Sequence, residues 1–302
     1  MWVFESPIIR TYMSEHDTLR RFIFDKLPVQ GRHVHLDATW RAAMERQDYP
    51  APVRALLGEA MAAAALLSAT LKFDGSITLQ IQGTGPVHLL VVQCTSGLSL
   101  RGLAHWNGEV PALGFRELVG DGRLAMTIEQ TNKPERYQSI VPLEGATLAA
   151  SLESYFERSE QLATRLWLTA GDGCAAGMLL QMLPDRQGDS DAWQHVTILS
   201  DTLKQAELSN LAAQEILHRL YNEDDVRLFE GAPVAFRCRC SRERIEGTLR
   251  SLGTEEVHSI LAERGKVDVD CEFCGKHYSF DAVDVDSLFS GALPLPAGAA
   301  RH

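Results

Sequence analysis

This sequence has no long hydrophobic run and no recognisable export signal. Its most apolar stretch, residues 60–71, lies between Glu59 and Lys72 and is well short of the roughly 20 residues that span a bilayer. The first residues lack a basic start followed by an apolar run and a small-residue cleavage site, so no signal peptide is expected. We therefore predict a cytoplasmic protein with no membrane partner.

The chain also lacks an excess of positive charge. It has 29 Lys and Arg residues against 40 Asp and Glu residues, a net charge of −11 and a pI near 5.4. Because phosphate contacts need a basic surface, we expect no nucleic-acid partner. With 302 residues, 45% of them apolar and 23% charged, the chain has the composition of a soluble globular protein with a substantial core.

Motifs for nucleotide-driven or hydrolytic chemistry are missing as well. No Gly-x-x-x-x-Gly-Lys-Ser/Thr loop occurs, and the segment from Gly83 to His88 lacks the third glycine of a dinucleotide fingerprint, so it is interpreted as a hairpin turn. No Ser-His-Asp or paired-carboxylate site can be argued from spacing. The histidines at 195, 218 and 258 are interpreted as surface or packing residues of helices. We expect no ATP use.

Cysteine is scarce, and four of the six cysteines lie near the C-terminus in two close pairs. Cys238 and Cys240 form the first pair, and Cys271 and Cys274 form the second. Two such pairs are the usual ligand set of a tetrahedral Zn(Cys)₄ site. Four soft thiolates favour Zn²⁺ over Mg²⁺ or Ca²⁺, and the paired spacing fits a two-knuckle zinc lobe better than an iron–sulfur cluster.

The other thiols and the nearest histidine are not expected to bind the metal. His277 is close to the second pair, but four cysteines already fill a tetrahedral shell, so it is interpreted as a surface residue. Cys94 ends an apolar strand and is predicted to be buried. Cys174 follows Gly171-Asp-Gly173 and is expected to be partly exposed.

A zinc site of this kind can be static or can act as a switch. A lobe of some fifty residues has a small core, so the metal would supply much of its folding free energy. Four arginines flank the first pair and would favour a reactive thiolate, although a solvated helix face explains them equally well. A Cys238–Cys240 bridge would close a tight, strained ring and would be readily reversible. The residues alone leave both interpretations open.

Upstream of the cysteines, residues 1–184 are predicted to form an α+β (mixed α/β) core domain. A buried helix is expected from Val53 to about Lys72, followed by a hairpin over residues 77–92, a β-rich stretch to Val141, a helix near 147–158 and a strand near 164–169. A polar, breaker-rich run begins at Pro184 and marks a domain boundary.

Residues 185–235 are predicted to be a helical linker. The helical pattern covers residues 191 to about 230. Its amphipathic helices must pack their apolar faces against another surface, and we expect the preceding domain to provide it. Ser209 is a possible N-cap there. Residues 236–289 are predicted to form the zinc-binding lobe, with Ser241 capping a helix that ends before Gly253. The tail, residues 290–302, is expected to be disordered.

The cysteine segments also resemble a known family. The run Phe236-x-Cys-x-Cys-Ser-Arg-Glu-Arg244 and the run Cys271-Glu-Phe-Cys274-x-x-x-Tyr278-x-Phe280 resemble the redox domain of the 33 kDa chaperonin (heat-shock protein 33) family. The resemblance extends from about Asp17 to Leu288, through further family blocks in the family's order: Tyr49-Pro50, Leu79 to Val87, Glu135-Arg-Tyr137, Tyr155-Phe and Ser159-Glu-Gln161. The chain departs from the family pattern at Gln30-Gly-Arg32 and at Cys174 to Gly177.

The resemblance implies a redox-regulated, ATP-independent holdase chaperone and no enzyme. Reduced protein would hold zinc on Cys238, Cys240, Cys271 and Cys274. Oxidation would form Cys238–Cys240 and Cys271–Cys274 disulfides, release the zinc, unfold the lobe and loosen the linker. The exposed apolar surface would then bind unfolding client proteins, with a homodimer as the oxidised, active form.

Two alternatives remain. A thiol–disulfide oxidoreductase would use Cys271-Glu-Phe-Cys274 as its dithiol, although that motif normally lies in a βαβ context. A structural zinc ribbon that binds nucleic acid is favoured by the arginines and opposed by the acidity of the chain.

Overall fold

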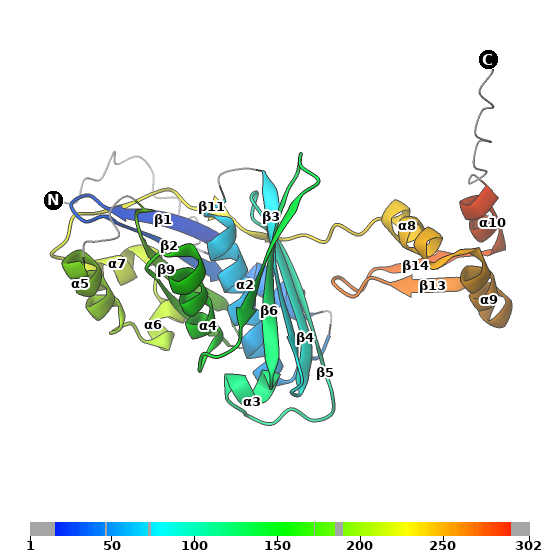
Figure 1. Cartoon of the computed structure of the whole chain (residues 1–302), viewed down its shortest axis with the longest axis horizontal. Coiled ribbons are helices and arrows are strands. Elements are labelled where there is room, and N and C mark those ends of the chain that lie inside the picture. The colour runs from blue at the N-terminus through cyan, green and yellow to red at the C-terminus, as the bar shows by residue number, and fades with distance from the viewer. Residues whose placement is uncertain (1–15, 46, 72–73, 172, 185–189, 291–302) are drawn as a thin grey trace, which may run out of the picture. The chain divides into compact units, whose positions relative to one another are not determined.

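The computed structural model describes residues 16–45, 47–71, 74–171, 173–184 and 190–290 (Figure 1). The chain forms two compact units, of which the first ends at Arg237 and the second begins at Cys238. Helices and sheets occur in both units, so the predicted mixed α/β class is confirmed. Of the tail predicted to be disordered, all but Ser290 lies outside the described residues.

The first unit contains two six-stranded sheets, called sheet A and sheet B here. Sheet A has the order β10 (Val226–Leu228), β1 (Thr18–Phe24), β2 (Val29–Leu36), β9 (Ala175–Met182) and β8 (Thr164–Ala170), with β11 (Ala232–Pro233) also paired to β1. Sheet B has the order β12 (Ala235–Phe236), β5 (Ser99–Trp106), β4 (Val87–Thr95), β3 (Gly75–Gly83), β6 (Gly122–Gln130) and β7 (Arg136–Pro142). Strands β3 and β4 form the predicted hairpin.

One apolar helix, α2 (Ala51–Ser68), packs against both sheets and forms the centre of the core (Figure 1). Its Ala, Leu and Met residues cover nearly every face, so it has no polar side to expose. By length and composition α2 could cross a membrane, but 72% of it is buried inside the protein, as expected for a core helix. The helix predicted to start at Val53 begins two residues earlier and ends at Ser68.

Glycine at position 177 allows α2 to lie close to sheet A. A Cβ atom on this residue of β9 would be 2.9 Å from a methyl carbon of Leu66. Any larger residue would push the helix away from the sheet, because both partners are fully packed. The smaller elements of this unit are α1 (Ala38–Met44), α3 (Phe115–Val119), α4 (Leu148–Tyr155) and the π-helical turn Phe156–Glu160.

Three helices of the predicted linker, α5 (Ser190–Ser200), α6 (Gln205–Asn210) and α7 (Ala213–Tyr221), belong to this first unit. Their apolar residues share a second buried cluster with side chains of sheet A, among them Phe22 and Met178. Sheet A is therefore covered by α2 on one face and by the linker helices on the other.

Two details of the linker prediction are wrong. The helical pattern does not continue to residue 230, because Val226–Leu228 forms β10 and pairs with β1. Ser209 is not an N-cap: it lies inside α6, and the N-cap of α7 is Ala212.

The second unit is a small lobe of three helices and one hairpin. Its elements are α8 (Arg242–Leu252), α9 (Thr254–Arg264), β13 (Val267–Asp270), β14 (His277–Phe280) and α10 (Ala282–Ser290). Ser241 caps α8 as predicted, with its hydroxyl accepting a hydrogen bond from the Arg244 amide. Gly253 and Gly265 follow α8 and α9 with φ of 98° and 74°, a backbone conformation that favours glycine.

Candidate metal centre

The four clustered cysteines come from two loops of the small lobe. Cys238 and Cys240 lie in the extended segment before α8, and Cys271 and Cys274 lie in the turn between β13 and β14. Three backbone hydrogen bonds shape that turn: Cys274 N to Cys271 O (3.2 Å), Gly275 N to Cys271 O (2.7 Å) and Cys271 N to Lys276 O (3.0 Å). Gly275 has φ of 65°, which lets the chain reverse tightly behind the second thiol.

The structure brings all four predicted site residues together. Their Sγ atoms lie within 4.8 Å of one another. Two close contacts join the two pairs: Cys238 to Cys271 is 3.5 Å and Cys240 to Cys274 is 3.3 Å. Sulfurs on a tetrahedral zinc ion are about 3.8 Å apart when each Zn–S bond is about 2.3 Å. The donor set and its dimensions therefore suit a metal ion of this size.

The thiols do not ionise equally. Burial disfavours the thiolate of Cys240, but the nearby Tyr278 hydroxyl and the neighbouring thiols outweigh this effect and lower its pKa to about 7. Burial, together with hydrogen bonds to Cys240 and Cys238, raises the pKa of Cys274 to about 12. The pKa of Cys271 is also raised, chiefly by burial. Cys240 is therefore the first of these thiols to ionise, and its negative charge disfavours ionisation of the others. A bound divalent cation would offset this repulsion between thiolates.

Tyr278 is a site residue that the sequence did not single out for this role. It is buried, its hydroxyl makes no hydrogen bond to any described residue, and its interaction with Cys240 helps to lower the pKa of that thiol. The signal was present in its position four residues after Cys274, but only the pairing of β13 with β14 turns the ring toward the thiols.

Of the arginines around the first pair, Arg242 contributes to the fold of the lobe. Arg242 packs over the Phe280 ring, with its guanidinium carbon 4.2 Å from the ring centroid, and forms an ion pair with Asp284 at 2.7 Å. It also donates a hydrogen bond to the Ser279 carbonyl. Within the described part of the chain, the interactions that shift the pKa values of Cys240, Cys271 and Cys274 involve no arginine.

Below the thiols lies a very small hydrophobic core. It consists of eight buried residues contributed by the helices and the hairpin: Leu249, Val257, Val267, Cys271, Tyr278, Phe280, Val285 and Leu288. Cys238, Cys240 and Cys274 pack against this cluster at its edge. The candidate ligands are therefore also part of the core of the lobe.

The remaining residues are placed as expected. His277 is exposed and its Nδ1 lies 2.8 Å from an Asp270 carboxylate oxygen, outside the thiol group. Cys94 is fully buried in β4, where burial raises its pKa to about 12. Cys174 is half-buried beside β9 and donates a hydrogen bond to the Ser209 carbonyl at 3.5 Å.

Comparison with known proteins gives one consistent result. A family model described as "Hsp33 protein" matches residues 17–281. A protein of Nitrosococcus oceani named "33 kDa chaperonin" is 51% identical over 290 residues, which is 96% of this chain and 100% of the relative. A protein of the same name from Shewanella denitrificans is 49% identical over 275 residues, 91% of this chain and 95% of the relative.

A solved structure has the same fold. The crystal structure of the 33 kDa chaperonin of Thermotoga maritima superposes with a TM-score of 0.82 and covers 91% of this chain and 99% of that chain, at 24% sequence identity.

Proposed function

The chain belongs to the Hsp33 family, and from this premise we propose that it is a redox-regulated, ATP-independent holdase chaperone. Membership of the family supports the chaperone role itself. The regulation is our proposal, and one observation carries it: four thiols lie within 4.8 Å of one another in a lobe whose described part has eight buried core residues.

In the resting protein, Cys238, Cys240, Cys271 and Cys274 hold one Zn²⁺ as thiolates. When bound, the ion supplies a cross-link between the loop before α8 and the β13–β14 turn, and so provides much of the folding free energy of the lobe. Four sulfur donors without a competing carboxylate favour zinc over harder ions.

Oxidation converts these thiolates into two disulfides, Cys238–Cys240 and Cys271–Cys274. Each bridge forms one S–S bond and gives up two electrons, so both bridges together reduce two molecules of hydrogen peroxide, with four protons, to four molecules of water. Disulfide sulfurs carry no charge to hold a cation, so the four residues lose their metal and the lobe loses its cross-link.

Unfolding of the lobe then loosens the linker helices α5, α6 and α7. These helices cover sheet A through an apolar cluster that includes Phe22, Met178 and Ile216. Separation would expose apolar surface on both partners, which is the property required to bind unfolding client proteins. The active form is a homodimer in the cytoplasm, and it acts without ATP, nucleic acid or an enzymatic step.

The environment of Cys271 and Cys274 gives less support to a thiol–disulfide oxidoreductase. Such dithiols normally lie in a βαβ unit. Here they lie in a two-stranded hairpin, and each has a thiol of the other pair within 3.5 Å.

Aggregation of heat-unfolded citrate synthase tests the proposal. Chain oxidised with hydrogen peroxide should suppress light scattering at equimolar ratio, and reduced, zinc-loaded chain should not. Re-reduction with dithiothreitol in the presence of zinc is the control and should abolish the suppression. Equal protection by the reduced form would refute redox gating. Peptide mapping of the oxidised chain distinguishes bridges within the pairs from bridges between them.

A further inference from the structure

Strand β7 leaves one long edge of sheet B open. It pairs with β6 along a continuous register from Arg136 opposite Glu129 to Pro142 opposite Arg123, without a bulge. On its other side, no strand of the described residues pairs with it. Half of its backbone N–H and C=O groups therefore point outward without a partner strand.

The other sheet edges of this unit are short, occupied or buried. Beyond β12, which covers only Ser99 and Leu100, the remainder of β5 has no partner strand on that side among the described residues, but its residues 102–104 are buried. Strand β10 has three residues and β12 has two, which is too little to accept a further strand. Edge strand β8 is as long as β7, but the Glu153 carboxylate of α4 accepts its Leu166 amide at 2.7 Å, and α4 packs along it. Proteins usually protect sheet edges in these ways to avoid unwanted pairing. Strand β7 stands out because it is both long and uncovered.

The side chains of β7 are those of a strand that can accept a partner. Tyr137 is 57% exposed and Ile140 is 52% exposed, and they lie on opposite faces of the strand. No charged residue occurs between Tyr137 and Pro142, so the edge would repel neither acidic nor basic segments. The charges gather instead at the hairpin tip, where Arg136 forms an ion pair with Glu129 at 2.8 Å.

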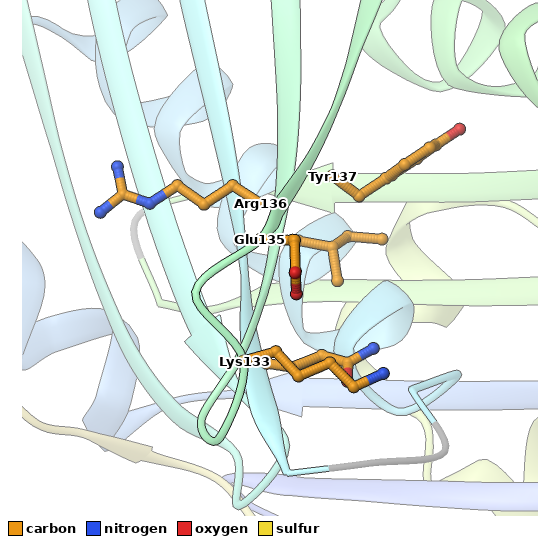
Figure 2. A pocket seen from close by; sticks show the side chains of 6 residues that line it. Lys133, Glu135, Arg136 and Tyr137 are labelled. Atoms are coloured by element: carbon orange, nitrogen blue, oxygen red, sulfur yellow. The ribbon is translucent and has the colours of Figure 1, made fainter.

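A groove lies at the start of this strand. It has a volume of about 490 Å³ and is lined by Ile128, Gln130, Lys133, Glu135, Arg136 and Tyr137. Figure 2 shows Tyr137 and Arg136 pointing to opposite sides of β7, with Lys133 below them near the hairpin tip. Its lining combines Ile128 and the Tyr137 ring with three charged side chains, and more apolar than polar surface is open to it, which suits one large apolar side chain.

Side-chain hydrogen bonds to α4 and to the π-helical turn also hold β7 in place. The Tyr155 hydroxyl at the end of α4 accepts a hydrogen bond from the Ser139 hydroxyl at 2.9 Å. Tyr155 and Tyr137 both hydrogen-bond to the Glu160 carboxylate of the π-helical turn. A strand fixed in this way offers its outer backbone groups in a constant geometry, which lowers the entropic cost of adding a further strand.

We propose that β7 binds an extended segment of an unfolded client protein as an additional strand of sheet B, with one apolar side chain of the client in the groove beside Tyr137. This inference rests on the proposed chaperone function and names a binding surface for it. Unfolded proteins differ in side chains but share an extended backbone, so backbone pairing at an edge recognises them without sequence specificity.

A second copy of the chain is a poorer occupant of this edge. Stable protein interfaces use about 20–30 residues on each side. A pairing of β7 with β7 would use the seven residues of one strand from each copy. A contact of this size suits a transient partner that binds at several weak sites at once.

The test uses the full-length oxidised protein and a fluorescent eight-residue peptide of alternating valine and threonine, with binding followed by fluorescence anisotropy. The decisive probe is the same peptide carrying an N-methyl group on every residue, which removes the N–H donors of both strand edges and keeps the side chains. We expect it to bind at least about tenfold more weakly, because several backbone hydrogen bonds are lost. Equal binding of the methylated peptide would overturn the proposal.

Variants locate the site. Ile140→Lys places a charge on the edge and should weaken the unmethylated peptide by about tenfold or more. Leu113→Lys is the matched control, since Leu113 is 37% exposed in the loop before α3, outside the sheets and the linker helices, and this variant should bind the peptide like the wild type. Unchanged peptide binding in Ile140→Lys would overturn the proposal. The proposal would also fail if sedimentation showed that Ile140→Lys no longer dimerises while it still binds the peptide.

The citrate synthase assay distinguishes failure of the proposed chaperone function from failure of the edge-strand inference. If oxidised wild-type chain does not suppress aggregation, the proposed function itself fails. If it does, and Ile140→Lys suppresses aggregation and binds the peptide as well as the wild type, only the edge-strand inference fails.

Discussion

The two compact units of this chain are held together in different ways. The first unit has an apolar helix packed between two six-stranded sheets, and a second apolar cluster under the linker helices. In the lobe, the described residues 238–290 include eight buried ones and one two-stranded sheet, and three of the four thiols lie at the edge of that small cluster. A core of that size rarely stabilises a domain alone. The comparison teaches that the lobe has far less apolar core than the first unit, so a cross-link through its four cysteines would matter more to its stability.

The largest effect is expected from removing one ligand. Cys271→Ser should abolish stoichiometric zinc binding and unfold the lobe under reducing conditions, because structural zinc contributes about 10 kcal/mol or more to such small domains. Metal analysis and amide hydrogen exchange measure the two consequences. Cys174→Ser is the matched control and should keep its zinc. Full zinc occupancy in Cys271→Ser would contradict the ligand assignment.

A substitution in the core of the first unit should have the opposite effect: it should lower the stability of that unit and leave zinc binding intact. Leu57 of α2 is fully buried, so Leu57→Ala should destabilise the first unit by about 2–5 kcal/mol and leave the zinc content unchanged. All five tryptophans precede residue 238, so tryptophan fluorescence during urea unfolding reports on this unit alone. Leu113→Ala, at a position 37% exposed, should change stability by less than about 0.5 kcal/mol. Zinc loss in Leu57→Ala would show that the units are not independent.

A rise in pH should act in opposite directions on the two units, lowering the stability of the first and favouring zinc binding by the lobe. Burial raises the pKa of Glu59 in α2 from 4.5 to about 7. Between these values the folded state holds the extra proton, so this carboxyl makes the first unit less stable as pH rises from 4.5 to 7, by up to about 3 kcal/mol. The lobe should instead lose zinc as pH falls, because protons compete for the thiolates.

Glu59→Gln isolates this effect. Its unfolding free energy relative to the wild type should increase by up to about 3 kcal/mol between pH 4.5 and pH 8, since glutamine cannot ionise. Urea titrations at a series of pH values measure it, and subtraction of the wild-type curve removes the other titrating groups, such as buried His33. The same change at exposed Glu109 is the matched control. A difference that is constant with pH would contradict the assignment.

The smallest effect is expected from removing one helix N-cap in each unit. Thr147 caps α4 in the first unit and Ser241 caps α8 in the lobe, each by accepting a backbone N–H hydrogen bond. Replacing either by alanine should cost about 1 kcal/mol. Thr147→Ala should lower urea stability only, whereas Ser241→Ala should weaken zinc binding about fivefold, because folding and metal binding are linked in the lobe. Identical behaviour of the two variants would remove the distinction between the units.

The features predicted from the sequence are those determined by nearby residues. The cysteine spacing located all four thiols of the site, the alanine-rich run predicted α2, and Ser241 with Gly253 marked the ends of α8. The features that were missed depend on distant partners. Val226–Leu228 became a strand only because β1 lies beside it, and Tyr278 reaches Cys240 only through the lobe hairpin.

The same limit applies to the sheet edges. Nothing in the β7 sequence shows that it is the last strand of sheet B, and nothing in the β8 sequence shows that Glu153 protects its edge. Edge strands are defined by the order of strands in space, which a hydrophobic pattern does not encode.

Hydrogen exchange of the whole chain before and after oxidation tests the central claim most directly. After peroxide treatment at elevated temperature, we expect one zinc ion released per chain, loss of protection for amides in residues 238–290, and retained protection in α2. A lobe that keeps both its metal and its protected amides after that treatment would contradict the account.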